Sequence, residues 1–453
     1  MPAAPAEATP AEARVRRDLV RSSVKRSAKG TVSCVRVLRG PGVVFRGDPK
    51  KYILAACCNG TGHLTQAGVL ADVLGRLGYE CVGVILEVGI SQKLLEEVIV
   101  PLGVPYLTLH GVQLINERGA VPISTLLVKG AAFSTHLRAD GKRVRKFVKE
   151  SGAGLLVNCW NYSLALHLST RRSARERVLH VAPQFALHAP LKTTKSASAN
   201  ESAWRGGLLA LIKLHTTTGR CVPIGPLIEG GARPILPPML NMPSAWGGPP
   251  AYGARPRPRP RPVRSRPLRV RRAAGQPRVV LCYFLSADCA GDLLRAATAL
   301  SPAAESGEVG PFECHCFSDP PLQSTDSRVV GHAKSRVDFR ALFERCDAVA
   351  CSAGNETVWE AVSRGVRVLA VPTPGHAEQV LNARAHAANF PSLVRASSRV
   401  DADGLRWLLQ HEASDGGAAA AAAMRAAVGS LSERLESALD PERSVTVEKL
   451  SAS

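Results

Sequence analysis

The sequence predicts an α/β protein with two parallel-sheet domains, on three observations. Residues 52–86 have the pattern of a strand, a glycine-containing loop, a helix and a second strand. Residues 347–383 repeat that order and end in a cluster of polar side chains. Between them, residues 225–277 are dense in proline and glycine, which is typical of a connection rather than a core. A chain of 453 residues is long enough for two or three domains.

The first unit opens with an apolar strand at 52–58 and a glycine-rich loop. The expected helix at 64–77 ends at Gly78, and a second strand follows at 81–86. Glycines permit a tight turn and the close approach of a ligand. His63 stands at the helix start, where the helix dipole favours a neutral imidazole that could accept a proton from a hydroxyl group. A histidine bonded only to nearby backbone is the alternative. The loop residues are Asn59, Gly60, Thr61 and Gly62.

The first half continues with strands and helices in loose alternation, and the polar residues of 183–188 could line an acceptor site or only close a loop. Expected strands lie at 106–109, 154–158 and 178–182, and expected helices at 94–100 and 142–151.

The second unit holds the densest group of candidate binding residues. A helix begins near Gly354, where backbone N–H groups could bind an anion such as a diphosphate. Glu360, one turn into that helix, could accept two hydrogen bonds from a ribose diol. Gln379 and Asn382 are three residues apart, so their amides would share a helix face and suit sugar hydroxyls. The alternatives are a capping box of Thr357 and Glu360, and a solvated face.

The other elements of the second half follow the same alternation, with Asp338 as a candidate N-cap. Expected strands lie at 279–285, 312–317, 329–330 and 366–371, and expected helices at 292–300, 339–346, 405–409 and 418–439, the last interrupted at Gly429.

These stretches resemble GT-B glycosyltransferases, most closely glycosyltransferase family 28. That family includes the bacterial N-acetylglucosaminyltransferase of peptidoglycan synthesis and has a group of poorly described microbial relatives. The N-G-x-G-H sequence that ends at His63 is similar to the family's N-terminal signature. Arg367 stands where the family has a proline. The C-terminal pattern is carried by Ser352, Gly354, Thr357, Glu360, Gly365, Pro372, Gln379, Asn382 and Ala383.

The resemblance implies a GT-B fold, with two Rossmann-like domains facing a central cleft. It implies a hexosyltransferase-type glycosyltransferase that moves a sugar, with inversion, from a nucleotide donor to an acceptor hydroxyl. The donor is expected to be a UDP-sugar. By the resemblance, His63 is the candidate base, Glu360 binds the ribose and Gln379 contacts the sugar. Asn158 and Asn161 stand where relatives have an acidic residue, so this loop is not expected to supply an acidic base. The expected donor-binding residues are Ser352, Gly354, Asn355, Thr357, Glu360, His376, Glu378, Gln379 and Asn382.

The predicted domains follow from these patterns. We expect a mostly disordered N-terminal extension at 1–48, an acceptor domain at 49–235, a Pro/Arg-rich linker or insertion at 236–276, a nucleotide-sugar-binding domain at 277–412, and a C-terminal helix and tail at 413–453. By the resemblance, the terminal helix crosses back to brace the N-terminal domain.

The formal net charge of +21 is unevenly distributed, because residues 255–272 carry nine arginines and no acidic residue. Such basic segments could contact a membrane surface, and relatives act on lipid-linked acceptors. The sequence has no recognisable nucleic-acid-binding module, so no specific nucleic-acid partner is expected. No apolar run approaches the roughly 18 residues of a membrane span. The chain is expected to be cytoplasmic, or organellar if residues 1–30 form a transit peptide.

The twelve cysteines are scattered and favour a reducing compartment. Neither the pair at 57–58 nor that at 314–316 has the spacing of a zinc knuckle, so no metal site and no other cofactor are expected. Two alternative functions remain. A nucleotide-sugar epimerase would turn over the donor without an acceptor, and a catalytically inactive GT-B protein would act as a binding partner.

Overall fold

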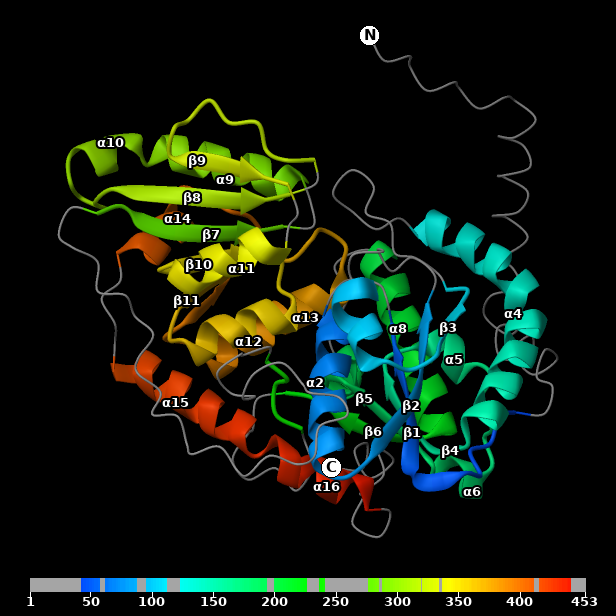
Figure 1. Ribbon diagram of the computed structural model, residues 1–453. Helices are drawn as coiled ribbons and strands as arrows, with labels where there is room; N and C mark the ends of the chain where they lie inside the picture. Colours follow the sequence, from blue (N-terminus) through cyan, green and yellow to red (C-terminus); the bar gives the residue numbers. More distant parts are fainter. Residues whose placement is uncertain are drawn as a thin grey trace, which may run out of the picture.

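The computed structural model describes residues 42–57, 62–87, 95–111, 123–193, 199–225, 236–240, 276–284, 287–318, 320–333, 336–410 and 415–440. In these ranges the chain forms two lobes, each built on a six-stranded parallel sheet (Figure 1). The N-terminal sheet has the order β3-β2-β1-β4-β5-β6, and the C-terminal sheet has the order β12-β11-β10-β7-β8-β9.

The N-terminal lobe alternates strands with helices along the chain. Its elements are β1 (Asp48–Ala56), α2 (Gly62–Arg76), β2 (Glu80–Glu87), η1 (Leu95–Ile99), η2 (Val100–Leu102), β3 (Tyr106–Leu109), α4 (Ile123–Ser151), β4 (Ala153–Cys159), α5 (Tyr162–Ala165), α6 (Arg172–Arg175), β5 (Val178–Ala182), η3 (Pro183–Leu187), α7 (His188–Thr193), α8 (Ala199–Thr218) and β6 (Arg220–Pro223).

The C-terminal lobe has the same alternation, followed by two terminal helices. Its elements are β7 (Arg278–Tyr283), α9 (Ala287–Ala299), α10 (Ser301–Glu305), β8 (Phe312–Phe317), β9 (Val329–His332), α11 (Arg336–Arg345), β10 (Ala348–Cys351), α12 (Asn355–Ser363), β11 (Arg367–Ala370), α13 (Ala377–Asn389), β12 (Val394–Ala396), α14 (Ala402–Leu409), α15 (Asp415–Gly429) and α16 (Leu431–Leu439).

The two sheets have one topology. When the strands of each lobe are numbered from its own first strand, both sheets have the order 3-2-1-4-5-6 of a doubly wound Rossmann-like domain. The strand order reverses between β1 and β4 in one lobe and between β7 and β10 in the other. Ligands of such sheets bind at the carboxyl ends of those strands. The prediction of two Rossmann-like domains is therefore confirmed.

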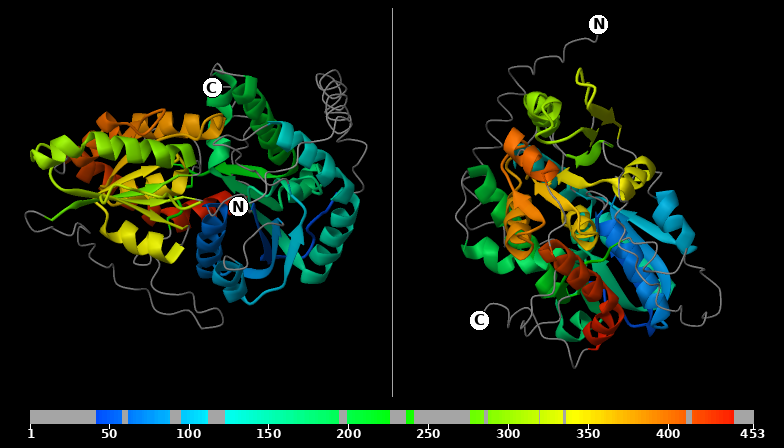
Figure 2. Two further views of the ribbon diagram at one scale, coloured as in Figure 1. Left: turned by 90° about the horizontal axis from the view of Figure 1, so that it is seen from above. Right: turned by 90° about the vertical axis from the view of Figure 1, so that its left-hand side faces the viewer.

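Both sheets are covered on their two faces, which explains why their strands are apolar runs rather than alternating ones. Every residue of β4, β5 and β10 is buried. Helices lie on either side of each sheet in the two perpendicular views (Figure 2). Because helices cover both faces of each sheet, the loops at the strand ends are the parts of each lobe left to bind a ligand.

The two terminal helices connect the lobes. Helix α15 packs against α12 of the C-terminal lobe, and α16 packs against α2 of the N-terminal lobe (Figure 1). Arg220 on β6 donates hydrogen bonds to the carbonyl oxygens of Ala438 (2.7 Å) and Leu439 (3.2 Å) at the end of α16. The chain thus crosses back to its first lobe, as expected for the terminal helix.

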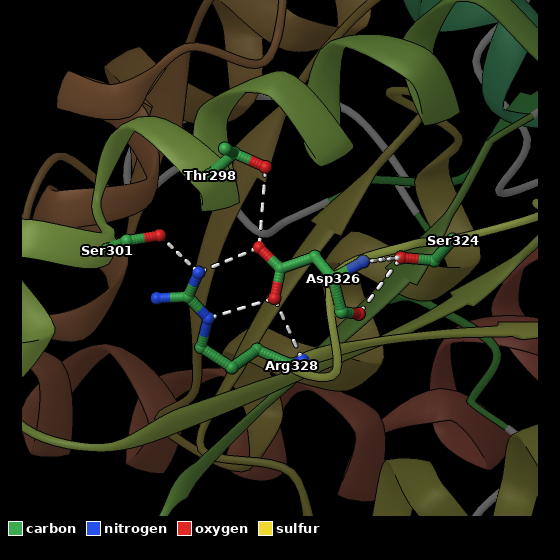
Figure 3. A network of polar contacts seen from close by, with 5 residues as sticks. All are labelled: Thr298, Ser301, Ser324, Asp326 and Arg328. Atoms are coloured by element: carbon green, nitrogen blue, oxygen red, sulfur yellow. Dashed lines mark hydrogen bonds and ion pairs between the residues drawn. The ribbon is translucent and has the colours of Figure 1, made fainter.

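A polar network holds the loop before β9 against the helices above it (Figure 3). Asp326 accepts hydrogen bonds from the Arg328 guanidinium at 2.7 and 2.9 Å and from the Thr298 hydroxyl at 3.3 Å. Arg328 also donates to Ser301, and Ser324 bonds the backbone of Asp326. Hydrogen bonding to Arg328 lowers the pKa of Asp326 below its usual value.

The structure corrects several sequence-based boundaries. Helix α4 begins at Ile123, well before the expected 142. Helix α11 begins at Arg336, so Asp338 lies inside its first turn and is not the N-cap. Residues 42–47 pack on the N-terminal lobe, where Val43 pairs with Leu168. Residues 236–240, assigned to the linker, are part of the same lobe: Leu236 is fully buried and pairs with Ile224.

The ten cysteines in the described ranges are all buried. Among the helices that the structure describes, none is both long enough and apolar enough to cross a membrane.

Candidate functional site

The start of α2 faces the start of α12 across the boundary between the lobes. Gln66 of α2 donates a hydrogen bond from Nε2 to the carboxyl group of Glu356, in the first turn of α12. A Cβ atom on Gly62 would lie 2.5 Å from Glu356 Oε2. The Glu356 carboxyl group of the opposing lobe takes the space beside Gly62. The sequence predicted room for a ligand there instead. The other loop residues, Asn59, Gly60 and Thr61, lie outside the described ranges.

A second contact joins the lobes beside the first. Gln184 of η3 donates from Nε2 to Glu378 Oε1 at 2.9 Å, and the same Nε2 lies 3.4 Å from His63 Nε2. Trp204 of α8 stacks on His376, with 5.0 Å between the ring centroids and 18° between the planes. The predicted residues His63, His376 and Glu378 thus all lie at the boundary between the lobes.

His63 is half-buried at the start of α2, and its Nδ1 lies 3.3 Å from Gln66 Oε1. Burial lowers the pKa of His63 to about 4, and the hydrogen bond with Gln66 opposes that shift. The neutral imidazole that the sequence predicts is therefore favoured, with burial as its cause in this structure. A neutral imidazole can accept a proton.

Two carboxyl groups lie at the boundary between the lobes, and both accept hydrogen bonds from glutamine amides of the N-terminal lobe. Burial is the largest cause of a pKa of about 7 for Glu378; the Glu356 charge raises it further, and hydrogen bonds from Gln184 and Asn382 lower it. Burial also raises the pKa of Glu356, against the hydrogen bond from Gln66. Shifted carboxyl pKa values at a cleft are typical of a functional site.

The start of α12 has the properties of an anion site. Gly354 is its N-cap and supplies no side-chain bond. Glu356 in the first turn accepts a hydrogen bond from its own backbone N–H, so an anion bound here would use the other first-turn N–H groups and the helix dipole. Ser352 and Asn355 are buried beside it. Because the helix begins at Asn355, Thr357 lies inside its first turn. The capping box of Thr357 and Glu360 is therefore wrong.

Glu360 lies one turn further along α12 and is separate from the cluster around His63. Its carboxyl group forms an ion pair with Arg340 of α11 at 3.6 Å, and its side chain is 14% exposed. The structure thus places Glu360 beside a cation of its own lobe, one helical turn beyond Glu356.

The polar residues of α13 hold its first turn. His376 is the N-cap and accepts from Gln379 N at 3.4 Å. Gln379 Oε1 accepts from Thr373 N at 2.7 Å, which leaves the amide nitrogen as the part of that side chain free to meet a ligand. Asn382 is buried and bonds to Glu378. These bonds fix the side chains of the predicted donor site before any ligand binds.

The two asparagines of the N-terminal lobe have structural roles. Asn158 bonds to His180 at 2.9 Å and to the carbonyl of Asn161. Asn161 caps α5 through Leu164 N and donates to Ala56 O. Both are fully buried. This loop brings no acidic group to His63, in agreement with the sequence.

Sequence reasoning missed Gln66, Glu356 and Trp204, and it considered Gln184 only as part of an acceptor loop. Each missed residue acts across the lobe boundary, and only the fold brings those partners together. In the described part of the chain, no group of three histidine, cysteine, aspartate or glutamate residues is placed to hold a metal ion.

No family model and no curated protein sequence matches this chain. Solved structures do. UGT89C1 of Arabidopsis thaliana, complexed with UDP-L-rhamnose, has a TM-score of 0.57 at 13% identity, over 86% of this chain and 98% of that one. A UDP-glucosyltransferase from Polygonum tinctorium that glucosylates indoxyl has a TM-score of 0.54 at 15% identity, over 88% and 100% of the chains. LpCGTa, in complex with UDP, has a TM-score of 0.52 at 16% identity, over 86% and 98%. The chain has the GT-B fold.

Proposed function

We propose that this protein is a glycosyltransferase that transfers a sugar from a UDP-sugar to a hydroxyl group of an acceptor. One observation carries the proposal: His63 of the N-terminal lobe and the donor segment of α13 meet at the boundary between the lobes through Gln184 and Glu378. Two solved structures with the same fold were determined with a nucleotide ligand bound: LpCGTa with UDP and UGT89C1 with UDP-L-rhamnose. The resemblance to family 28 rests on the sequence motifs alone.

The reaction needs one proton transfer and one displacement. His63 Nε2 takes the proton of the acceptor hydroxyl as its oxygen attacks the anomeric carbon of the sugar. The bond between that carbon and the diphosphate oxygen breaks, and UDP leaves with the electron pair. Attack from the opposite face inverts the anomeric carbon. The proton then passes from His63 to solvent.

The C-terminal lobe holds the donor in this proposal. Backbone N–H groups at the start of α12, beside Ser352 and Gly354, stabilise the charge that develops on the diphosphate. In this proposal backbone N–H groups, and not a metal ion, stabilise the UDP leaving group. Glu360 accepts from the ribose hydroxyls, and this competes with its ion pair to Arg340. Gln379 Nε2 and Glu378 meet the sugar hydroxyls.

The finer assignments are also proposals. They are a hexose as the sugar, a lipid-linked acceptor reached at a membrane surface through the basic segments, and a cytoplasmic or organellar location. The charge of residues 255–272 supports the membrane contact. A Gln379→Ala variant screened against UDP-hexoses would test the first, and binding to anionic vesicles with and without residues 255–272 would test the second.

Isothermal titration with UDP and a panel of UDP-sugars tests the donor site, using the full chain and its Glu360→Ala variant. Wild type should bind UDP, and the variant should bind roughly tenfold or more weakly, because a charge-assisted hydrogen bond contributes about 1.5–3 kcal/mol. Glu344→Ala, an exposed carboxylate that pairs with the same Arg340, is the control and should bind UDP normally. Wild type that binds no UDP ligand at millimolar concentration would contradict the donor assignment.

A second experiment separates the transferase from the two alternatives. His63→Asn should retain UDP binding and lose at least 100-fold in transfer rate, because general-base catalysis contributes roughly 10²–10⁴-fold. Turnover of the donor without acceptor would favour the epimerase. UDP-sugar binding without any turnover would favour the binding protein.

A further inference from the structure

The His63 ring lies between two glutamine side chains, and each glutamine also holds a carboxyl group of the other lobe. On one side, Gln66 Oε1 lies 3.3 Å from Nδ1 while Gln66 Nε2 donates to Glu356. On the other side, Gln184 Nε2 lies 3.4 Å from His63 Nε2 and 2.9 Å from Glu378 Oε1. One imidazole is thus linked through two amides to α12 and α13.

The chemistry of these amides fixes which ring nitrogen carries the proton. An amide oxygen only accepts, so Nδ1, opposite Gln66 Oε1, must carry the hydrogen. An amide nitrogen only donates, so Nε2, opposite Gln184, must present its lone pair. Ionised carboxylates only accept as well, so Glu356 and Glu378 turn the amide nitrogens toward themselves. The carboxylates orient the amides, and the amides select the tautomer.

The amide oxygen of Gln184 lacks a hydrogen-bond donor. Gln184 is 4% exposed, and its Oε1 is buried with no hydrogen-bond partner among the described residues. A buried carbonyl oxygen normally accepts a hydrogen bond. The N–H of Gln184 also occupies the position, in front of His63 Nε2, that an acceptor hydroxyl must take. A ligand with two hydroxyl groups could donate one hydrogen bond to Gln184 Oε1 and, by displacing the 3.4 Å contact of Gln184 Nε2, another to His63 Nε2.

We propose that Gln66 and Gln184 are positioning residues that hold His63 as its Nδ1–H tautomer, with the Nε2 lone pair facing the acceptor hydroxyl. Because their own orientation comes from Glu356 and Glu378, the base is set only while the two lobes are together. Domain closure and base activation are then one event. This inference rests on the proposed function for the role of His63, but the tautomer itself does not depend on turnover.

Nitrogen NMR of the full chain, labelled at histidine and saturated with UDP, measures the tautomer directly. The measurement is made at pH 8, above the pKa of about 7 for Glu378, and His63→Asn assigns the signal. The charge of His63 helps to lower the pKa of His215 of α8, so the His215 signal is followed too. Wild type should show a single Nδ1–H tautomer.

Three variants should relax that tautomer to a mixture. Gln66→Met and Gln184→Met remove one amide each with little change of shape. Glu356→Gln keeps both glutamines but lets the amide of Gln66 turn over, so a change in one lobe alters a ring in the other. Gln410→Met, at an exposed position after α14, is the matched control and should leave the signal unchanged.

Kinetics complete the test. Gln66→Met and Gln184→Met should lower kcat by about 10–100-fold while Kd for UDP stays within about threefold. An unchanged tautomer in all three variants would overturn the proposal, even if the enzyme is active. A relaxed tautomer in a protein that transfers no sugar would support the positioning and remove the proposed function instead.

Discussion

The carboxyl groups of Glu356 and Glu378, at the boundary between the lobes, and the carboxyl group of Asp326 have opposite environments. Asp326 accepts from an arginine and a hydroxyl at the edge of the C-terminal lobe, and its pKa is lowered. Glu378 accepts from the amides of Gln184 and Asn382 between the lobes, and its pKa is raised to about 7. Both groups are hydrogen-bonded, so hydrogen bonding alone does not set the direction of the shift.

The direction of each pKa shift depends on whether the charge of the hydrogen-bond partner outweighs the effect of burial. A guanidinium compensates the loss of hydration around Asp326, whereas amides compensate it only in part around Glu378. The first arrangement stabilises the fold at neutral pH. The second costs stability at neutral pH, and it leaves a strong acceptor in the cleft for the hydroxyls of a ligand. Structural and functional carboxylates can be distinguished in this protein by that contrast.

Removing the paired carboxylate should have the largest effect. Asp326→Ala should lower the free energy of unfolding by about 1.5–3 kcal/mol at pH 7, because it leaves Arg328 without its charged partner. Urea unfolding measures the change. A lowered pKa means that this stabilisation exists above the usual value of 3.8 and is lost as the pH falls below it, so the difference should shrink in acid.

Asp403→Ala is the control for that measurement. Asp403 pairs with Arg406 at 3.8 Å, and its side chain is 78% exposed, so its removal should cost less than about 0.5 kcal/mol. Equal losses in the two variants would remove the contrast between a compensated carboxylate and an ordinary surface one.

Replacing the uncompensated carboxylate should have the opposite sign. Between the usual pKa of 4.5 and about 7, the unfolded chain loses the Glu378 proton while the folded chain keeps it, so wild type loses stability as the pH rises. Glu378→Gln does not titrate and should gain roughly 1–3 kcal/mol over wild type from pH 5 to pH 8, at about 1.36 kcal/mol per pKa unit. Thermal unfolding across this pH range measures it.

Glu436→Gln, on the exposed face of α16, controls for the removal of a negative charge from a basic protein. If the two variants gain equally between pH 5 and pH 8, the burial of Glu378 is not the cause and the comparison fails.

The smallest expected effect comes from two glycines of one helix. A Cβ on Gly62 would meet Glu356, whereas a Cβ on Gly75 would meet nothing within 4 Å. Gly75→Ala should therefore stabilise the protein by about 0.5–1 kcal/mol through helix propensity. Gly62→Ala should show no such gain, because it pushes the Glu356 carboxyl out of its contact. Similar gains in thermal unfolding would show that the lobes do not press on Gly62.

Short apolar strands bounded by turn residues could be predicted to the residue. The expected strands at 106–109, 178–182 and 312–317 are β3, β5 and β8 with unchanged limits. The start of α4 was missed because residues 123–141 are rich in glycine, serine and threonine and lack a clear apolar stripe. Local composition decides such cases only weakly, and tertiary packing overrides it.

The candidate site divides in the same way. His63 and the α12–α13 segment carry motifs that can be read from the chain, and the structure brings them together. Gln66 and Glu356 are 290 positions apart, and a glutamine on a helix face has no pattern that names its partner. Residues that act between lobes therefore become visible only when the lobes are placed.

Helix α16 belongs to the C-terminal part of the chain but is hydrogen-bonded to the N-terminal lobe. A backbone cut anywhere in residues 241–275 would yield two polypeptides, and the second would carry the helix that grips β6 of the first. A nicked protein should therefore remain one particle on a sizing column. For the same reason, the two halves could be produced as separate chains and should reassociate through the contacts of α16 with β6 and α2.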